Sequence, residues 1–240
     1  MKAVIYSFRQ VIREAKSDLM LFIVCFVPFL AGSVFRFGIP VLEKLLTSYF
    51  HKDQIIVPFY GLIDGFLVTL SSMMFCFVSA MIVLEERDTG IEKYMAVTPV
   101  GKEGYFVSHF IIPTGIAYFV SMLAMTLFHL SPINPLRVIA GCIPAAMCGL
   151  LCGLLIVSLA GNKVEGMAIS KLSGMTIFAI AVPFLLKGNI QYICGFLPSF
   201  WLGRFLIYED IVSFLMAVIV AIIWIIACMR YKPRATRFDG

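Results

Sequence analysis

The chain has 240 residues, of which 61% are hydrophobic and 14% are charged, and its formal net charge is +5. A soluble domain is usually about 45–50% apolar and about 25% charged, so this composition excludes an ordinary soluble enzyme. The positive charge does not indicate nucleic acid, because Lys and Arg gather at the edges of apolar segments, as membrane orientation produces. We therefore expect one membrane domain over residues 1–240, with the lipid bilayer as its solvent and no nucleic-acid partner.

The first segment, residues 1–18, predicts an amphipathic helix. Val4, Phe8 and Val11 recur at helical spacing, and Arg9 and Arg13 fall at other positions of the helix. One face is therefore apolar and the other basic. We expect an interfacial helix on the inner leaflet, with a partner-binding helix as the alternative.

Six apolar segments follow, each near the length of about 20 residues that a membrane-crossing helix needs. They are Leu19–Ile39, Phe59–Leu84, Tyr105–Leu130, Leu136–Ala160, Met167–Leu186 and Ile211–Met229. The predicted fold class is an all-α integral membrane protein with six transmembrane helices. Of the 19 Lys and Arg residues, 13 fall on the side of the termini and six on the other side. The excess predicts that both termini are cytoplasmic.

Two spans contain features beyond apolarity. Asp64 is the one acid inside a predicted span, and such residues usually face a cavity. We expect either a functional contact or a helix-end side chain that reaches water, with Arg36 as a candidate partner. In the fourth span, Gly141, Gly149 and Gly153 share one face, which predicts close helix packing within the chain or between subunits.

The segment 187–210 is half apolar and is interrupted by Pro198, so it is too broken to span. Irregular backbone at membrane depth is tolerated only against protein or a watery cavity. We expect a re-entrant outer segment before the last span, and the alternative is a simple loop in the aromatic belt.

The sequence lacks the motifs of the common catalytic sites. It contains neither GxxxxGK[ST] nor HExxH, so it has no loop to cradle ATP phosphates and no zinc-protease helix. Its three histidines and seven cysteines do not show zinc-ligand spacing. We therefore expect no catalytic residue, no metal site and no cofactor bound by this chain.

The most informative segment is the loop 85–102 between the second and third spans. Acidic residues end the span, Gly90 breaks the helix, and Ile91, Tyr94 and Met95 then share one side of a short helix. Thr98-Pro99 ends that helix, because proline disfavours helix at the preceding residue. The spacing fits a helix that docks on a cytoplasmic partner as well as it fits a solvated loop.

At this loop the chain resembles the ABC-2-type permeases, the transmembrane subunits of ATP-driven exporters. Glu86, Gly90, Glu92, Thr98 and Pro99 occupy the places of the family's acidic helix end, helix start and Thr/Ser-Pro. The order Thr89-Gly90 departs from the commoner Gly-Thr. Residues 1–18 are similar to the family's connecting helix. Residues 162–168, with Lys163, Glu165 and Gly166, are similar to its second cytoplasmic loop, and residues 196–201 to its external re-entrant region.

The resemblance implies a non-catalytic permease subunit in the bacterial plasma (inner) membrane. A separate ABC ATPase, in two copies, would bind ATP and Mg, and a second permease would complete a homodimer or heterodimer. The cargo would be a drug-like, peptide or lipid-like amphipathic compound. The implied ATPase-coupling residues are Glu86, Gly90, Ile91, Glu92, Lys93, Tyr94, Met95, Thr98 and Pro99. Spans two and five would line the path, with Asp64, Ser71, Ser72, Ser170, Ser173 and Thr176 as candidates.

Three other functions compete with this one. A secondary transporter would be expected to show an internal repeat and broken helices near the midplane, and a membrane enzyme would need paired acids or a Ser/His set inside the spans. The substrate-binding subunit of a vitamin importer is disfavoured by the amphipathic first segment and the coupling-like loop. An adjacent ATPase reading frame would favour the exporter.

Overall fold

The computed structural model describes residues 2–51, 53–91, 101–132, 134–186 and 188–230, and within these ranges the chain is helical without strands. Six helical segments of the described chain are long and apolar enough to cross a membrane: Leu19–Phe50, Val57–Asp88, Glu103–Phe128, Pro135–Leu159, Lys163–Leu185 and Ile211–Arg230. The predicted all-α, six-helix fold class is confirmed.

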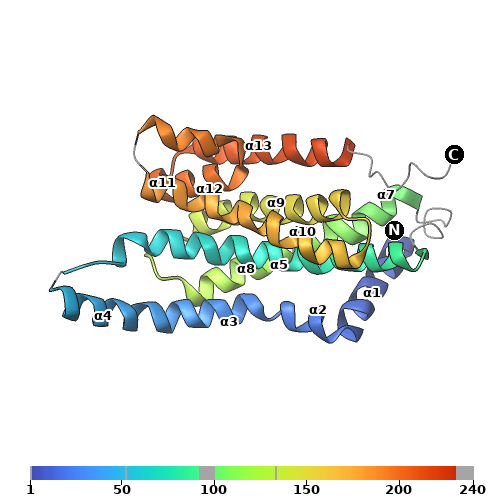
Figure 1. The fold of residues 1–240 in the computed structure, drawn as a ribbon, viewed down its shortest axis with the longest axis horizontal. Coiled ribbons are helices and arrows are strands. Elements are labelled where there is room, and N and C mark those ends of the chain that lie inside the picture. Colours follow the sequence, from blue (N-terminus) through green and yellow to red (C-terminus); the bar gives the residue numbers. More distant parts are fainter. Residues whose placement is uncertain (1, 52, 92–100, 133, 187, 231–240) are drawn as a thin grey trace.

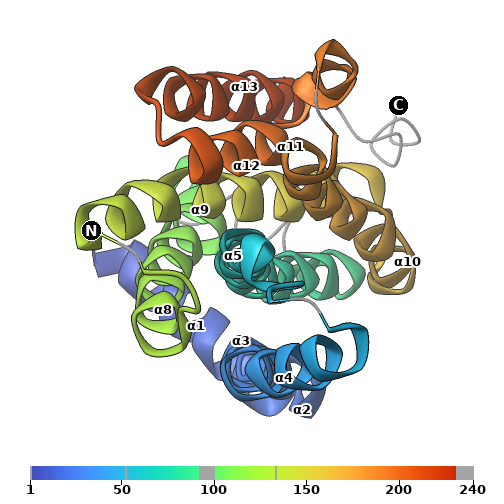
Figure 2. The same ribbon diagram turned by 90° about the vertical axis from the view of Figure 1, so that its left-hand side faces the viewer.

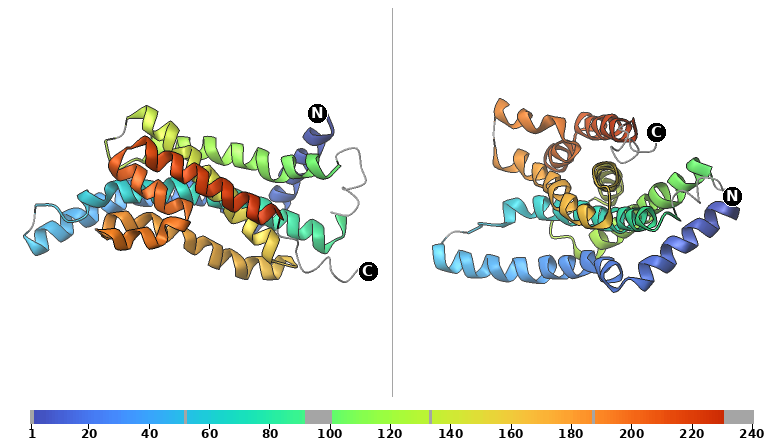
Figure 3. Two further views of the ribbon diagram at one scale, coloured as in Figure 1. Left: turned by 90° about the horizontal axis from the view of Figure 1, so that it is seen from above. Right: turned by 45° about the vertical axis from the view of Figure 1, so that its right-hand side comes forward.

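The membrane-spanning helices lie nearly parallel along the long axis of the molecule (Figure 1). In chain order, the α-helices of the described residues are α1 (Lys2–Ser17), α2 (Leu19–Val24), α3 (Val27–Ser33), α4 (Ile39–Phe50), α5 (Tyr60–Asp88), α7 (Gly101–Phe106), α8 (Ile112–Phe128), α9 (Pro135–Leu159), α10 (Lys163–Gly174), α11 (Val182–Leu185), α12 (Pro198–Tyr208) and α13 (Ile211–Arg230). Figure 1 places α1 and α7 at one end of the bundle, the α1 end, and α4 and α11 at the other, the α4 end. In Figure 3, α1 leaves the bundle at an angle to the spanning helices.

Three of the spans change helix type in their interior, and a fourth, Val57–Asp88, begins with a 3₁₀ turn (Val57–Phe59) before α5. A π-helical turn joins α3 to α4 (Val34–Gly38), a second joins α7 to α8 (Val107–Ile111), and a 3₁₀ stretch joins α10 to α11 (Met175–Ala181). The prediction that the first span ends at Ile39 is wrong, because the helix continues to Phe50. Pro40 does not stop it, because the helix passes through the π-helical turn Val34–Gly38 just before Pro40, and such a turn accommodates a break in the i→i−4 ladder.

Helix α5 is the centre of the bundle. Viewed along the axis, it is surrounded by α3, α8, α9 and α10, while α12 and α13 lie beyond α9 (Figure 2). In the most apolar stretch of its span 78% of the residues are buried, against 17% for α13. A central position explains why α5 carries serines and glycines together with apolar residues: it has no lipid-facing side to cover.

The backbones of α5 and α9 touch because α9 presents glycines to α5. A Cβ atom on Gly149 would lie 2.6 Å from the carbonyl oxygen of Ser72, and one on Gly153 would lie 3.0 Å from that of Cys76. Small residues permit this approach in lipid, where van der Waals packing drives helix association. The small-residue face of the fourth span therefore packs within the chain.

The segment before the last span turns back inside the bundle. Its 3₁₀ helix (Asn189–Phe196) ends where the carbonyl of Phe196 accepts a hydrogen bond of 2.7 Å from Trp224 Nε1. Trp224 lies about 20 Å along α13 from Ile211 at 1.5 Å per residue. The chain then returns through α12 to the start of α13 (Figure 1). This path agrees with the predicted re-entrant segment, whose place in a membrane stays a prediction.

The α5–α9 contact predicts the effect of a single methyl group. Gly149→Ala forces a Cβ against backbone, which cannot rotate away, so we expect a cost of about 1–3 kcal/mol, typical of overpacking. Gly115→Ala is the matched control, since a Cβ there meets no atom within 4 Å. Thermal unfolding in detergent should show a lower melting temperature for Gly149→Ala alone. Equal melting temperatures for the two variants would contradict the close contact.

Candidate functional site

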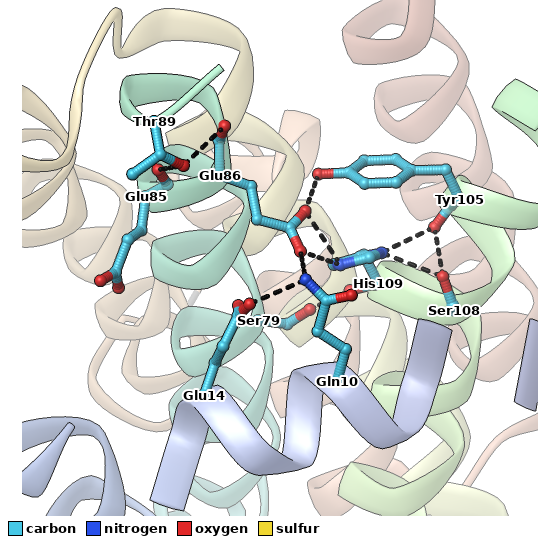
Figure 4. A network of polar contacts seen from close by, with 9 residues as sticks. All are labelled: Gln10, Glu14, Ser79, Glu85, Glu86, Thr89, Tyr105, Ser108 and His109. Atoms are coloured by element: carbon cyan, nitrogen blue, oxygen red, sulfur yellow. Dashed lines mark hydrogen bonds and ion pairs between the residues drawn. The ribbon is translucent and has the colours of Figure 1, made fainter. Parts of the chain in front are cut away.

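A buried polar network at the α1 end joins four helical elements around Glu86 (Figure 4). The Glu86 side chain is 1% exposed. Its carboxylate accepts a hydrogen bond of 2.6 Å from the Tyr105 hydroxyl and lies 3.2–3.3 Å from His109 Nε2. Gln10 of α1 donates to it at 3.5 Å. One carboxylate thus connects α1, α5, α7 and the π-helical turn after α7.

Further contacts hold the partners of Glu86 in place. His109 Nδ1 lies 3.0 Å from both the Ser108 hydroxyl and the Tyr105 carbonyl. The Tyr105 and His109 rings stack with centroids 4.1 Å apart, and Gln10 also donates to Glu14 at 2.9 Å (Figure 4). Burial raises the pKa of the Glu14 carboxyl, because the charged form loses hydration.

A cation, Lys163, ties the second predicted cytoplasmic loop to the same end. Lys163 Nζ lies 2.9 Å from a carboxylate oxygen of Asp18 and 2.9 Å from one of Glu85. Its backbone N–H donates to Asp88 at 2.9 Å. The hydrogen bond from Lys163 lowers the pKa of Asp18, which also caps α2 by accepting from the backbone N–H of Met20. This cluster joins α2, α5 and α10.

The start of α10 is fixed by local sequence. Asn162 accepts from the backbone N–H of Glu165 at 2.8 Å, and Glu165 reaches back to accept from the N–H of Gly161 at 2.7 Å, an arrangement related to the capping box. Gly166 lies against α5, where a Cβ would overlap the side chain of Leu84. Arg87 donates to the carbonyl of Ala160 at 2.9 Å. Lys163, Glu165 and Gly166 are thus brought together at the junction with α5.

The predicted coupling residues fall into two groups. Glu86 lies inside the bundle, so in this conformation it holds helices together and is not a surface contact. Gly90 has a left-handed φ of 77° just after α5, and Ile91 is half-buried. Glu92, Lys93, Tyr94, Met95, Thr98 and Pro99 lie outside the described residues, and their role stays a prediction.

The network predicts unequal effects for adjacent glutamates. Glu86→Ala removes the acceptor of the half-buried Tyr105 hydroxyl and the partner of Nε2 of the fully buried His109, and we expect a loss of about 1–3 kcal/mol from the buried imidazole that loses its partner. Glu85→Ala removes one of two acid partners of Lys163 at a half-exposed position and should cost under about 1 kcal/mol. Melting temperatures and hydrogen exchange of α1 measure both effects. Similar losses in the two variants would show that Glu86 is not the link to α1.

Asp64 at the α4 end is buried and fully hydrogen-bonded. It is 1% exposed and accepts 2.9 Å bonds from the backbone N–H groups of Leu130 and Ser131, as well as a bond from the Ser131 hydroxyl. The expected partner Arg36 instead donates to the carbonyl of His129. The alternative of a helix-end side chain reaching water is therefore wrong. Asp64 holds the segment between α8 and α9 against α5.

Two cavities lie beside this segment. The first, the Asp64 cavity, has a volume of about 150 Å³, and its walls include Asp64, Val68, Met125, Arg137, Phe205 and Glu209. The second, the Gln191 cleft, has a volume of about 680 Å³ and includes Gln191, Phe184 and Tyr208. The two share Gly61, Ser131, Pro132 and Leu206. The α4 end thus offers space for a small molecule.

The serines expected to line a path face different neighbours within one chain. Ser71 and Ser72 are fully buried, and Ser72 shares a hydrogen bond of 2.9 Å with Ser121 of α8. Ser173 accepts from the Cys152 thiol, and Thr176 donates to the carbonyl of Ser173. Ser170 lines a separate cavity between α5 and α10. Of the predicted path residues, Asp64 alone lies at the α4-end cavities.

Sequence reasoning did not single out His109, Tyr105, Gln10, Arg137 or Glu209. The first three contact Glu86, but the sequence does not show that their helices lie beside the end of α5. A usable signal existed for Tyr105 and His109, which are four residues apart and so lie on one helix face beside the acidic end of the second span.

These features define a multi-pass α-helical membrane protein, with a polar junction at one end and two adjoining cavities at the other. The chain belongs to the Rv2686c-like family, described as fluoroquinolones export permease protein Rv2686c-like. The model of this family matches residues 11–231. This membership agrees with the resemblance to ABC-2-type permeases.

Two relatives, both from Mycobacterium tuberculosis, are named fluoroquinolones export permease proteins. They are MT2760 of strain CDC 1551 / Oshkosh and Rv2686c of strain ATCC 25618 / H37Rv. Each is 25% identical to this chain over 204 residues, which cover 82% of the chain and 78% of the relative. No solved structure matches the chain.

Proposed function

We propose that this chain is the membrane-spanning subunit of an ATP-driven exporter in the bacterial inner membrane. A separate ATPase, in two copies, binds ATP and Mg, and a second permease, identical or homologous, completes the transporter. The observation that carries this proposal is the hydrogen-bonded junction of helices at the α1 end. There the segment before residues 92–100 is joined by hydrogen bonds to α1, α7 and α10 through Glu86 and Lys163.

The mechanism follows from that connection. A partner that binds the segment 85–102 pushes on the end of α5, and the polar contacts carry the displacement to the neighbouring helices as one body. Rigid-element motion of this kind is an established route for coupling sites. The names of the M. tuberculosis relatives favour a fluoroquinolone or a similar amphipathic drug as the cargo.

A secondary transporter is the second candidate. Buried acids and histidines in spans often form proton relays, and Asp64, Glu86 and His109 are all at most 1% exposed. Asp64 disfavours this candidate, because its carboxylate holds the segment between α8 and α9 through hydrogen bonds from Leu130 and Ser131.

Orientation is tested by cysteine labelling. The 13-to-six distribution of Lys and Arg predicts a cytoplasmic α1 end. In a variant without native cysteines, a membrane-impermeant maleimide added to intact cells should label His51→Cys and miss Thr89→Cys. Permeabilised cells are the control, in which both positions should react. The reverse pattern in intact cells would place the docking segment on the wrong side for an ATPase.

Coupling is tested within the segment itself. We expect Tyr94→Ala to reduce transport strongly, because a buried aromatic anchor can contribute more than about 2 kcal/mol to docking, whereas Lys93→Ala at a rim should have little effect. Both variants should insert and leave basal ATPase activity intact. Measured efflux and ATPase co-purification report the difference. Wild-type efflux from Tyr94→Ala, Met95→Ala and their combination would reduce this segment to a linker.

A further inference from the structure

An ion pair at the mouth of the Asp64 cavity has no role in the proposed coupling. Arg137, in the first turn of α9, binds Glu209, at the end of α12, and the two side chains are 48% and 41% exposed. An exposed pair of this kind contributes little to stability. Its two charges are therefore available to exchange partners with a ligand.

Glu209 lies at the end of α12, where it has a left-handed φ of 54° and caps the helix. Gly or Asn favours that position, and a longer side chain is held there at a cost. The Glu209 carboxylate lies beside Arg137 at the cavity mouth.

The inside of the cavity is chemically different from its mouth. Val68, Met125 and Phe205 form apolar walls. Asp64 lies among them, but its oxygens are taken by Leu130 and Ser131. The cavity therefore offers an apolar interior with one exchangeable cation and one exchangeable anion at its rim.

We propose that the Asp64 cavity binds a zwitterionic aromatic amphiphile, with its carboxylate on Arg137, its protonated amine on Glu209 and its ring system against the apolar walls. The inference rests on the proposed function and assigns the binding site and the charge contacts of its cargo. A zwitterion replaces one internal ion pair by two new ones. A ligand with a single charge leaves either Arg137 or Glu209 without a partner.

The adjoining Gln191 cleft accommodates ligands longer than the cavity. Gln191 is 8% exposed, and its side-chain Oε1 has no hydrogen-bond partner among the described residues. A buried acceptor without a donor is costly. An N–H group on the part of the ligand that extends past Gly61 and Ser131 would satisfy it.

Two quinolones separate the roles of the two charges. Ciprofloxacin carries a carboxylate and a basic amine, whereas nalidixic acid carries the carboxylate without that amine. The full chain in phosphatidylcholine nanodiscs is dialysed against each probe, and empty nanodiscs correct for partition into lipid. Arg137→Gln should weaken the binding of both probes about ten-fold, as expected for the loss of one charge-assisted contact. Glu209→Gln should weaken the binding of ciprofloxacin about ten-fold and leave the binding of nalidixic acid undiminished.

Three further variants control for charge and shape. Lys44→Gln removes a positive charge at the same end, away from the cavity, and should bind both probes like wild type. Gly141→Ala places a methyl group in the cavity at an ordinary 3.6 Å from Phe205, so the fold is kept and both probes should bind more weakly. Gly115→Ala, in open space, should change nothing.

Efflux from cells that express the chain with its ATPase separates this inference from the proposed function. If wild type exports ciprofloxacin while Arg137→Gln and Glu209→Gln bind both probes normally, the site assignment is wrong and the exporter stands. If wild type neither binds nor exports it, the cargo class is wrong and the site assignment fails with it. If ciprofloxacin binding disappears when phosphatidylethanolamine is added to the phosphatidylcholine nanodiscs, the cavity holds a phosphatidylethanolamine headgroup, and the cargo site is overturned.

Discussion

The contact between the backbones of α5 and α9 is the constraint on which the rest of the structure depends. Gly149 and Gly153 bring α9 onto the carbonyl groups of Ser72 and Cys76. In lipid no hydrophobic force draws helices together, so close packing of this kind holds the bundle. With α5 fixed at the centre, α8, α10 and α3 pack around it, and its two ends become meeting points for the connecting segments.

The length of α5 places its two acids far apart on one rigid element. Asp64 and Glu86 are separated by about 33 Å at 1.5 Å per residue. Glu86 binds side chains from α1, α7 and the following π-helical turn, whereas Asp64 binds the segment that leads into α9. A helix held in this way moves as a unit, which is how binding at the α1 end would change the cavities at the α4 end.

The fold could be predicted from the sequence because hydropathy and small-residue spacing are local signals. The spans, the glycine face of α9 and the re-entrant segment all follow from stretches of at most about 25 residues, the range for a membrane crossing. The end of the first span was misjudged, because Pro40, Glu43 and Lys44 resemble a loop. Glu43 instead lies inward, accepting from the backbone N–H groups of Ile55 and Ile56.

The candidate site was harder to predict because its contacts are long-range. Gln10 and Glu86 are 76 residues apart, and Arg137 and Glu209 are 72 apart, so no motif contains either pair. Asp64 was identified from the cost of an acid in a span, but its partners are backbone groups that no sequence pattern marks. Ser72 and Ser173 were assigned to a path by the family resemblance, and their faces became known only from the packing of α8 and α9 against them.

The source of energy is the central claim, and transport in proteoliposomes tests it most directly. The chain is reconstituted with and without its ATPase, and ciprofloxacin uptake into inside-out vesicles is followed with ATP or with an imposed proton gradient. We expect uptake only when the ATPase and ATP are both present, and no uptake by the chain alone. Uptake by the chain alone under a proton gradient, at the rate of the complete system, would contradict the account and identify a secondary transporter.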